Sequence, residues 1–190
     1  LKSAFDIAME RAKRLGEASP EEVKKGDFVA EGERLAARYL RGECNLIAEL
    51  SRYDEEARGY AAESAQGILL RNMDLPRNDF AKGINRRVLE GIKALKGDKG
   101  GVENVYSKIR RLFKHYEQEG EQQRSQVYET LKREFQRQLE QAAQQPGLST
   151  RVEVERQPQF QEQWRRSLAQ LDSQYYRLLE ECKQELEGIP

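Results

Sequence analysis

Apolar residues recur at spacings of three and four positions along most of the chain, while strand-like alternation is nearly absent. This period is typical of helices that bury one face. It predicts a first helix over residues 2–15 and a second that begins at Pro20, with Ser19 as its N-cap. We therefore expect an all-α fold whose N-terminal portion, residues 1–96, contains at least three helices.

The apolar stripe continues through a long tract over residues 27–73. Gly42 is its best candidate interruption and would divide it into two helices. Pro76 ends the tract, because proline disfavours helix in the residue before it. A further helix is predicted over residues 77–96. The glycine-rich segment 97–101 then reads as a loop, which would separate an N-terminal domain, 1–96, from a second domain, 102–190.

The second half begins with a long helical stripe that contains a polar gap. From residue 117 to residue 126 there is no apolar side chain, and Gly120 lies in this interval. A helix that is polar all round either crosses solvent or bends. We favour a continuous helix that bridges a globular base and a protruding hairpin, because Glu and Gln favour helix. The alternative is a break, after which the hairpin folds back.

The last helix should begin near Pro158, and its apolar residues alternate spacings of four and three from Trp164 to Cys182. This is a heptad seam, and the short polar link over 145–157 favours antiparallel neighbours. We therefore predict a long helix followed by an antiparallel coiled-coil hairpin that pairs residues 127–142 with 164–182. The candidate partner-binding seam consists of Leu131, Phe135, Leu139, Trp164, Leu168, Leu171, Tyr175 and Leu178.

Composition agrees with elongated helices. Charged residues make up 35% of the chain and hydrophobic ones 37%, which is too little apolar material to fill a compact sphere easily. No run approaches the roughly 18 apolar residues of a membrane span, so no membrane partner is expected. Cys44 and Cys182 form no CxxC motif, which favours free thiols in a reducing cytoplasm.

The sequence offers few groups for chemistry. Its one histidine, His115, has Leu112 three positions before it, so no Glu-x-x-His metal pair exists. The segment 97–101 lacks the spacing of a phosphate-binding loop. We therefore expect no catalytic residue, no metal and no cofactor, and hence no enzyme.

Charge is unevenly distributed although the net charge is zero. Residues 77–114 contain eleven basic and four acidic residues, whereas the flanking segments are acidic. Such a basic region can contact phosphates, or it can bind acidic protein surfaces. The candidate phosphate-contacting residues are Lys82, Arg86, Arg87, Lys93, Lys96, Arg110, Arg111 and Lys114.

Narrow apolar seams on a polar chain favour a protein that binds other helices. Seams that a single chain cannot cover attract another helix. We expect a non-enzymatic interaction or assembly protein that forms homo-oligomers or binds a helical partner through its coiled-coil seams. The alternative is a nucleic-acid- or ribosome-associated protein that uses the basic region, for which no aromatic RNA-binding signature is present.

Overall fold

The computed structural model describes residues 20–143 and 153–190, with the side chains of residues 25–141 and 153–190. The all-α prediction is confirmed, and these ranges contain no strand. No helix within them is long and apolar enough to cross a membrane. The predicted helix over 2–15 and the Ser19 cap lie outside the described residues. The predicted start at Pro20 is confirmed, because the first described helix begins there.

The chain divides into two compact units. Unit 1 comprises Leu1–Met73 and Arg86–Leu95, and unit 2 comprises Asp74–Asn85 and Lys96–Pro190. Helix α5 (Asp79–Leu95) therefore contributes residues to both units. The domain boundary expected over 97–101 stays a prediction.

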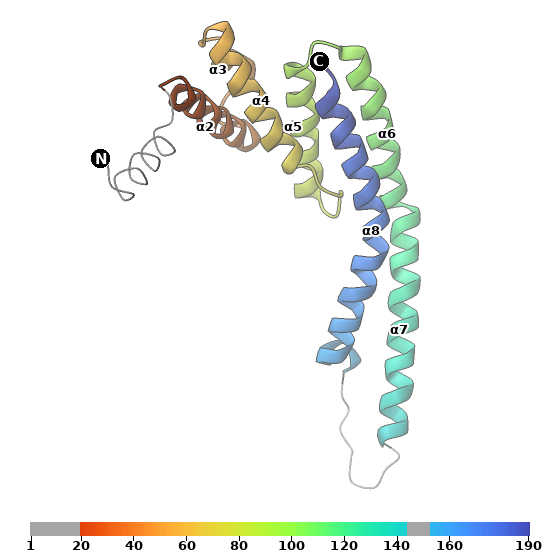
Figure 1. Cartoon of the computed structure of the whole chain (residues 1–190). Helices are drawn as coiled ribbons and strands as arrows, with labels where there is room; N and C mark the ends of the chain where they lie inside the picture. Colours follow the sequence, from red (N-terminus) through yellow and green to blue (C-terminus); the bar gives the residue numbers. More distant parts are fainter. Residues whose placement is uncertain (1–19, 144–152) are drawn as a thin grey trace, which may run out of the picture. The chain divides into compact units, whose positions relative to one another are not determined.

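Unit 1 contains α2 (Pro20–Arg41), α3 (Leu46–Leu50) and α4 (Glu55–Arg71) (Figure 1). Gly42 ends α2 with a φ of 79°, a conformation that glycine adopts without strain. The expectation of two helices over 27–73 is wrong, because the tract is interrupted a second time after α3. The side chains of Asn45 and Asp54 accept hydrogen bonds from the amides of Ala48 and Ala57, so each begins a new helix.

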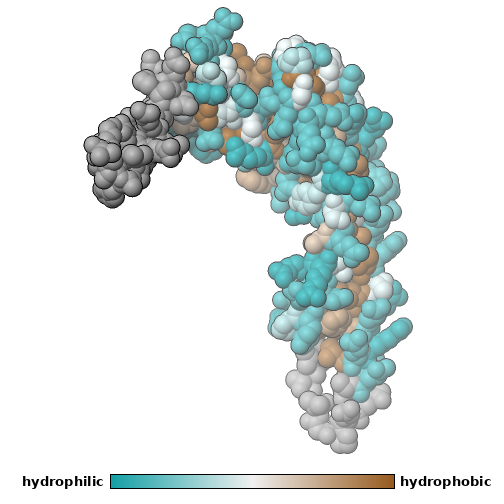
Figure 2. All heavy atoms as spheres, in the orientation of Figure 1, coloured by the Kyte–Doolittle hydropathy of each residue, from teal (hydrophilic) through white to brown (hydrophobic). Residues whose placement is uncertain are grey.

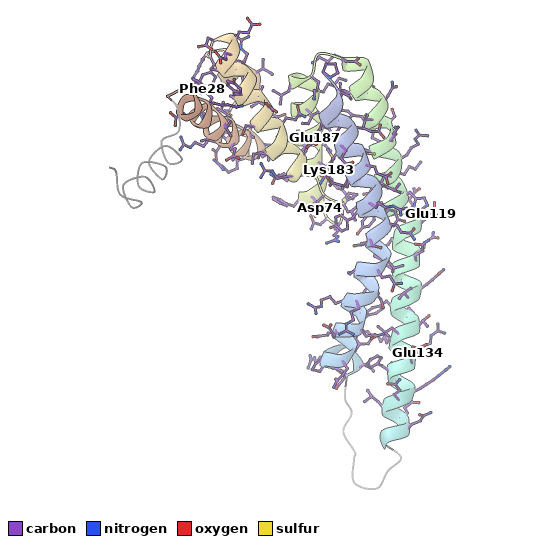
Figure 3. All side chains as sticks on the ribbon, viewed as in Figure 1. Phe28, Asp74, Glu119, Glu134, Lys183 and Glu187 are labelled. Carbon is purple, nitrogen blue, oxygen red and sulfur yellow. The ribbon has the colours of Figure 1, made fainter. Side chains whose placement is uncertain are left out.

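The core of unit 1 depends on the close approach of α2 and α4. Gly32 is buried, and a Cβ at this position would lie 2.2 Å from the carbonyl oxygen of Ala61. Phe28 on α2, labelled in Figure 3, meets Tyr53 edge to face with 6.0 Å between the ring centroids. Arg87 donates hydrogen bonds to the carbonyls of Tyr39 and Leu40 and so binds the C-terminal end of α2.

Unit 2 contains α6 (Lys99–Glu117), α7 (Glu119–Ala143), the short 3₁₀ helix η1 (Val154–Arg156) and α8 (Pro158–Gly188). The predicted start at Pro158 is confirmed. The expected loop over 97–101 is shorter than predicted. Asp98 accepts a hydrogen bond from the amide of Gly101, so the N-cap of α6 lies within the glycine-rich segment.

Within unit 2, α8 runs antiparallel to α6 and α7 (Figure 1). Its C-terminal half packs on α6 and its N-terminal half on α7. Helix α7 continues in the direction of α6 after one non-helical residue, Gln118, whose amide still bonds to the carbonyl of Lys114. The polar gap is therefore nearly continuous helix. Whether α7 and α8 form a coiled coil stays a prediction.

The end of α8 is attached to the segment that precedes α6. The Lys96 ammonium donates hydrogen bonds to the carbonyls of Glu187, at 3.0 Å, and Ile189. The amides of Gly97 and Asp98 donate to the carbonyl of Pro190. These bonds satisfy carbonyls that a helix end otherwise leaves without partners.

Candidate functional site

A groove of about 1040 Å³ runs between α8 and the α6–α7 pair of unit 2. Its apolar lining comes from Leu112 on α6, Val127 on α7, and Leu171 and Leu178 on α8. Leu178 is 43% exposed although it is a large apolar side chain. Grooves of this kind accept the apolar face of a helix.

Charged side chains mark one end of the groove. Lys108 on α6 and Glu185 on α8 form an ion pair across it, with 2.6 Å between Nζ and the closer carboxylate oxygen. Both side chains are about half exposed, so their mutual attraction is screened by water. Glu181 lies one turn before Glu185 on the same face of α8 and also lines the groove. This end of the groove is therefore more acidic on the α8 side.

The groove exists because α8 buries a different stripe from the one predicted. In its C-terminal half the buried residues are Asp172, Tyr175, Leu179, Cys182 and Leu186, which also alternate spacings of three and four. The predicted seam is shared with this stripe only at Tyr175 and Cys182. Leu171 and Leu178 face the groove instead, one residue before Asp172 and Leu179.

The predicted seam residues nearer the α7–α8 link come together in a second apolar region. Leu131 is buried with Val154 and Phe160, and Tyr128 and Trp164 pack against this cluster with their ring centroids 5.1 Å apart. The remaining seam residues of this region are only half-buried: Phe135, Leu139 and Leu168. Figure 2 shows apolar atoms exposed in a strip where α7 and α8 lie side by side. By contrast, Glu119 and Glu134 are exposed on α7 (Figure 3).

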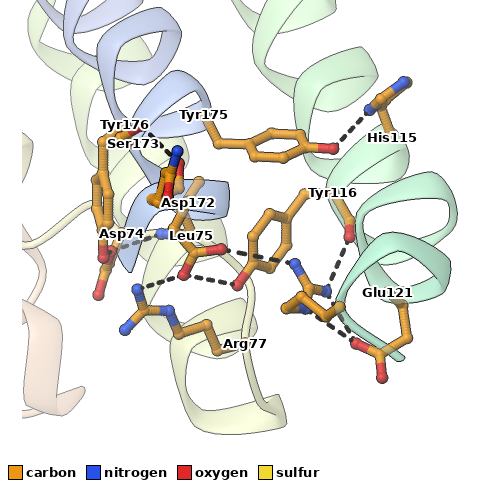
Figure 4. A network of polar contacts seen from close by, with 12 residues as sticks. Asp74, Leu75, Arg77, His115, Tyr116, Glu121, Asp172, Ser173, Tyr175 and Tyr176 are labelled. Atoms are coloured by element: carbon orange, nitrogen blue, oxygen red, sulfur yellow. Dashed lines mark hydrogen bonds and ion pairs between the residues drawn. The ribbon is translucent and has the colours of Figure 1, made fainter. Parts of the chain in front are cut away.

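A polar network crosses unit 2 beside the groove (Figure 4). Asp172 is 1% exposed, and its Oδ2 accepts a hydrogen bond from Arg77 at 2.8 Å. Its Oδ1 lies 3.7 Å from Nη1 of Arg124 on α7. Arg124 also donates to the carbonyl of Tyr116 and lies over the ring of that tyrosine. The carboxylate of Asp172 is thus enclosed by two cations, which is the condition for burying a charge.

This network accounts for the polar gap of the sequence. Two gap residues contact α8 directly: Gly120, which is buried, and Arg124, whose side chain is 12% exposed. A Cβ on Gly120 would lie 3.0 Å from the hydroxyl of Tyr175, so glycine makes room for this ring. An ion pair and a close approach therefore replace apolar packing where the stripe is interrupted.

A smaller cavity of about 370 Å³ lies beside the network. Each of its cations has a carboxylate partner: Arg77 pairs with Asp172, Lys82 with Glu117 at 2.6 Å, and Arg124 with Glu121 at 2.9 Å. The hydrogen bond to Glu117 raises the pKa of Lys82. The charges of this cavity therefore balance within it, and it offers an anion or a cation no excess of opposite charge.

The reactive groups near the groove favour their neutral forms. Burial raises the pKa of the Cys182 thiol above its ordinary value, which disfavours the nucleophilic thiolate. Burial likewise raises the pKa of the Tyr175 hydroxyl, which shares a hydrogen bond with Nδ1 of His115 at 2.9 Å. Over the described ranges no group of three or more His, Cys, Asp and Glu residues is arranged to hold a metal ion.

The predicted phosphate-contacting residues fall in both units. Arg86, Arg87 and Lys93 belong to unit 1, and the others belong to unit 2: Lys82, Lys96, Arg110, Arg111 and Lys114. Several have intramolecular roles already described, such as Lys96 at the end of α8. Arg110 is paired with Glu103, and Arg111 donates to the carbonyl of Ser107. Arg86, Lys93 and Lys114 are exposed.

Sequence reasoning missed the residues that organise the site: Asp172, Arg124, Arg77 and Gly120. One signal could have found two of them. Asp172 occupies a heptad position if the stripe is read through Tyr175, Leu179, Cys182 and Leu186, and Arg124 lies eight residues after Tyr116, on the same face of a continuous helix. Arg77 precedes α5 and carries no such signal.

Comparison with known proteins gives one result. No curated protein and no solved structure matches the chain. A family model does match, and it covers residues 47–188, which include α4 through α8, all of α3 but its first residue, and every residue of the groove. The chain belongs to this family, which is described as a family of unknown function (DUF6657).

Proposed function

We propose that this chain is a non-enzymatic interaction protein, and that the groove of unit 2 binds the apolar face of a partner helix. The observation that carries the proposal is that Leu178 is exposed and Leu171 only half-buried along a groove that Leu112 and Val127 also line. Covering this row removes apolar surface from water, which is worth roughly 25 cal/mol per Å² before the costs of association.

The half-buried seam between α7 and α8 supports the same proposal. Two antiparallel helices cover each other along one line and leave the flanks of that line open. In the described part of unit 2, α7 packs on α6, α8 and η1, and Phe135, Leu139 and Trp164 stay only half-buried. Helical pairs of this kind gain stability when further helices complete a bundle.

The groups near the groove support a role without chemistry. Burial raises the pKa of Cys182 and of Tyr175, so both stay protonated where a nucleophile or a base would have to lose its proton. The charged side chains of the neighbouring cavity are paired with one another. As the compartment we propose the cytoplasm, which the free thiols of Cys44 and Cys182 support.

The nucleic-acid alternative stays a prediction. Its support is the excess of basic residues over 77–114, of which Arg86 and Lys114 are exposed. Fluorescence anisotropy with short RNA and DNA at two salt concentrations tests it. Binding that weakens with salt would favour it over the groove, whereas no binding at low salt would remove it.

The groove is tested with a fluorescein-labelled synthetic amphipathic helix of about 18 residues that carries leucines at spacings of three and four. We expect saturable anisotropy that Leu178→Gln reduces and Ile47→Gln leaves unchanged. Ile47 is a matched control, because it is 44% exposed and Leu178 is 43% exposed, but it lies on α3 of unit 1. Equal binding by all three proteins would contradict a groove site.

A further inference from the structure

The apolar groove face of α8 can pair with a second copy of itself. Its apolar residues are Leu171 and Leu178, seven positions apart, with Gln174 and Tyr175 at the midpoint. Two such helices laid antiparallel about this midpoint bring Leu171 of each copy opposite Leu178 of the other. Seven residues are two helical turns, so both leucines stay on the contacting face.

Resting on the proposed function, we propose that the helix that fills the groove of unit 2 is α8 of a second copy of this chain, antiparallel and related by a twofold axis at residues 174–175. A twofold interface uses the same patch on both partners, so the patch must complement itself. The row Leu171, Gln174 and Leu178 meets this condition, because each leucine of one copy contacts a leucine of the other and the two rows have the same length.

Charge along α8 selects the antiparallel direction. Residues 158–171 contain one acidic and two basic residues, whereas residues 176–188 contain four acidic and two basic residues. Glu181 and Glu185 line the groove, whereas Arg165 and Arg166 near the other end of α8 are highly exposed and share one acidic partner, Glu162. An antiparallel pair brings the acidic end of each helix to the basic end of the other, whereas a parallel pair places like charges together.

Polar groove residues fit the same register. Gln174 lies at the axis, and its side-chain amide both donates and accepts, so two copies can bond to each other. Ser167 falls opposite Cys182 of the second copy, and Gln170 falls opposite residue 179, within one turn of Glu181. The hydroxyl of Ser167 and the amide of Gln170 are donors that a carboxylate accepts from readily.

Sedimentation equilibrium of the full chain between about 1 and about 200 µM gives the first test. We expect a monomer–dimer equilibrium whose Kd rises at least about tenfold in Leu178→Gln, and again in the double variant with Leu171→Gln, because each substitution occurs twice in a symmetric dimer. Ile47→Gln should leave the Kd unchanged. Because Leu178 is exposed in the monomer, circular dichroism should show equal helicity in every variant.

Disulfide mapping tests the register itself. In the double variant Leu171→Cys with Leu178→Cys, residue 171 of each copy lies opposite residue 178 of the other, so mild oxidation should give a covalent dimer joined 171 to 178. Links between the two copies of residue 171, or between the two copies of residue 178, would show parallel pairing and overturn the proposal.

The two proposals fail separately. A wild-type chain that stays monomeric at every concentration, yet binds the synthetic helix in a manner sensitive to Leu178→Gln, overturns the second copy and keeps the groove. A monomer that binds no helix overturns both. A dimer whose Kd is the same in Leu178→Gln and in Ile47→Gln associates elsewhere and overturns the inference.

Discussion

Asp172 on α8 lies opposite Arg124 on α7, with 3.7 Å between Oδ1 and Nη1, at the point where the apolar stripe of α7 is interrupted. Both atoms are buried without a direct hydrogen bond between them. The pair therefore joins the helices by charge rather than by packing. It also fixes the rotation of α8, because burying Asp172 turns Leu171 and Leu178 toward the groove.

Removal of Asp172 is predicted to destabilise unit 2 strongly. Asp172→Ala leaves Arg77 without its carboxylate and leaves Arg124 with only the exposed Glu121 as a partner. Losing one partner of a buried ion pair costs about 3 kcal/mol or more. The double variant Asp172→Leu with Arg124→Leu should recover most of this loss, because paired apolar residues of similar volume replace a buried ion pair at little cost. Urea unfolding followed by circular dichroism measures both.

The double variant also separates stability from function. If the ion pair sets the rotation of α8, the double variant should be stable yet dimerise more weakly than the wild type. Equal destabilisation in the single and double variants would contradict a role for the pair itself and would indicate lost packing instead.

The sequence predicted helix type and several helix starts well, because those signals are local. Pro20 and Pro158 each begin a helix, and Gly42 ends one, since each acts through its own backbone geometry. Asn45 and Asp54 are equally local caps, but the apolar stripe continues across them and hid the two starts. An apolar stripe indicates which residues can be buried, whereas an N-cap residue indicates where the backbone hydrogen bonds of a helix begin.

The choice of the buried face on α8 could not be made from the sequence. When α8 is considered alone, Leu171 is a better apolar seam residue than Asp172, and Leu178 and Leu179 are equally apolar. Arg77 and Arg124 reverse this preference by neutralising Asp172, and Arg77 is 95 positions away in the chain. Long-range pairing of charges carries no periodic signal, so the groove was found only in the structure.

Replacement of Gly32 is predicted to separate α2 from α4. In Gly32→Ala the new Cβ would meet the backbone carbonyl of Ala61 at 2.2 Å, and a backbone atom moves only with its helix. We expect a loss of about 1–3 kcal/mol in the stability of unit 1, measured by urea unfolding. The control is Gly59→Ala on α4, which has nothing within 4 Å of the added Cβ and should gain about 1 kcal/mol from helix propensity. Equal effects of the two substitutions would contradict the close approach.

The attachment of α8 to the residues before α6 is predicted to depend on Lys96. Lys96→Met keeps most of the apolar stem but removes the donors to the carbonyls of Glu187 and Ile189. Hydrogen bonds from a charged donor contribute about 1.5–3 kcal/mol each, so we expect at least about 2 kcal/mol of destabilisation. Hydrogen exchange should show faster exchange in the last turn of α8, while Lys114→Met, which replaces an exposed lysine on α6, should leave that turn unchanged.

Tyr176 gives a prediction for alkaline pH. Its hydroxyl donates to Oδ1 of Asp74 at 2.8 Å, and burial together with this carboxylate raises its pKa from 10.0 to about 12. A raised pKa means that the folded state holds this proton more tightly than the unfolded state does. The contribution to stability is therefore complete below pH 10 and is lost as the pH rises from 10 to about 12.

Absorbance at the phenolate band should then show Tyr176 as a late-titrating group, identified by comparison with Tyr176→Phe. The stability difference between wild type and Tyr176→Phe should shrink over the same interval, because the phenylalanine has no proton to lose. Asp74→Asn should move the titration of Tyr176 toward lower pH, since it removes the negative charge that opposes ionisation. A Tyr176 that ionises with the other tyrosines in the wild type would contradict the bond to Asp74.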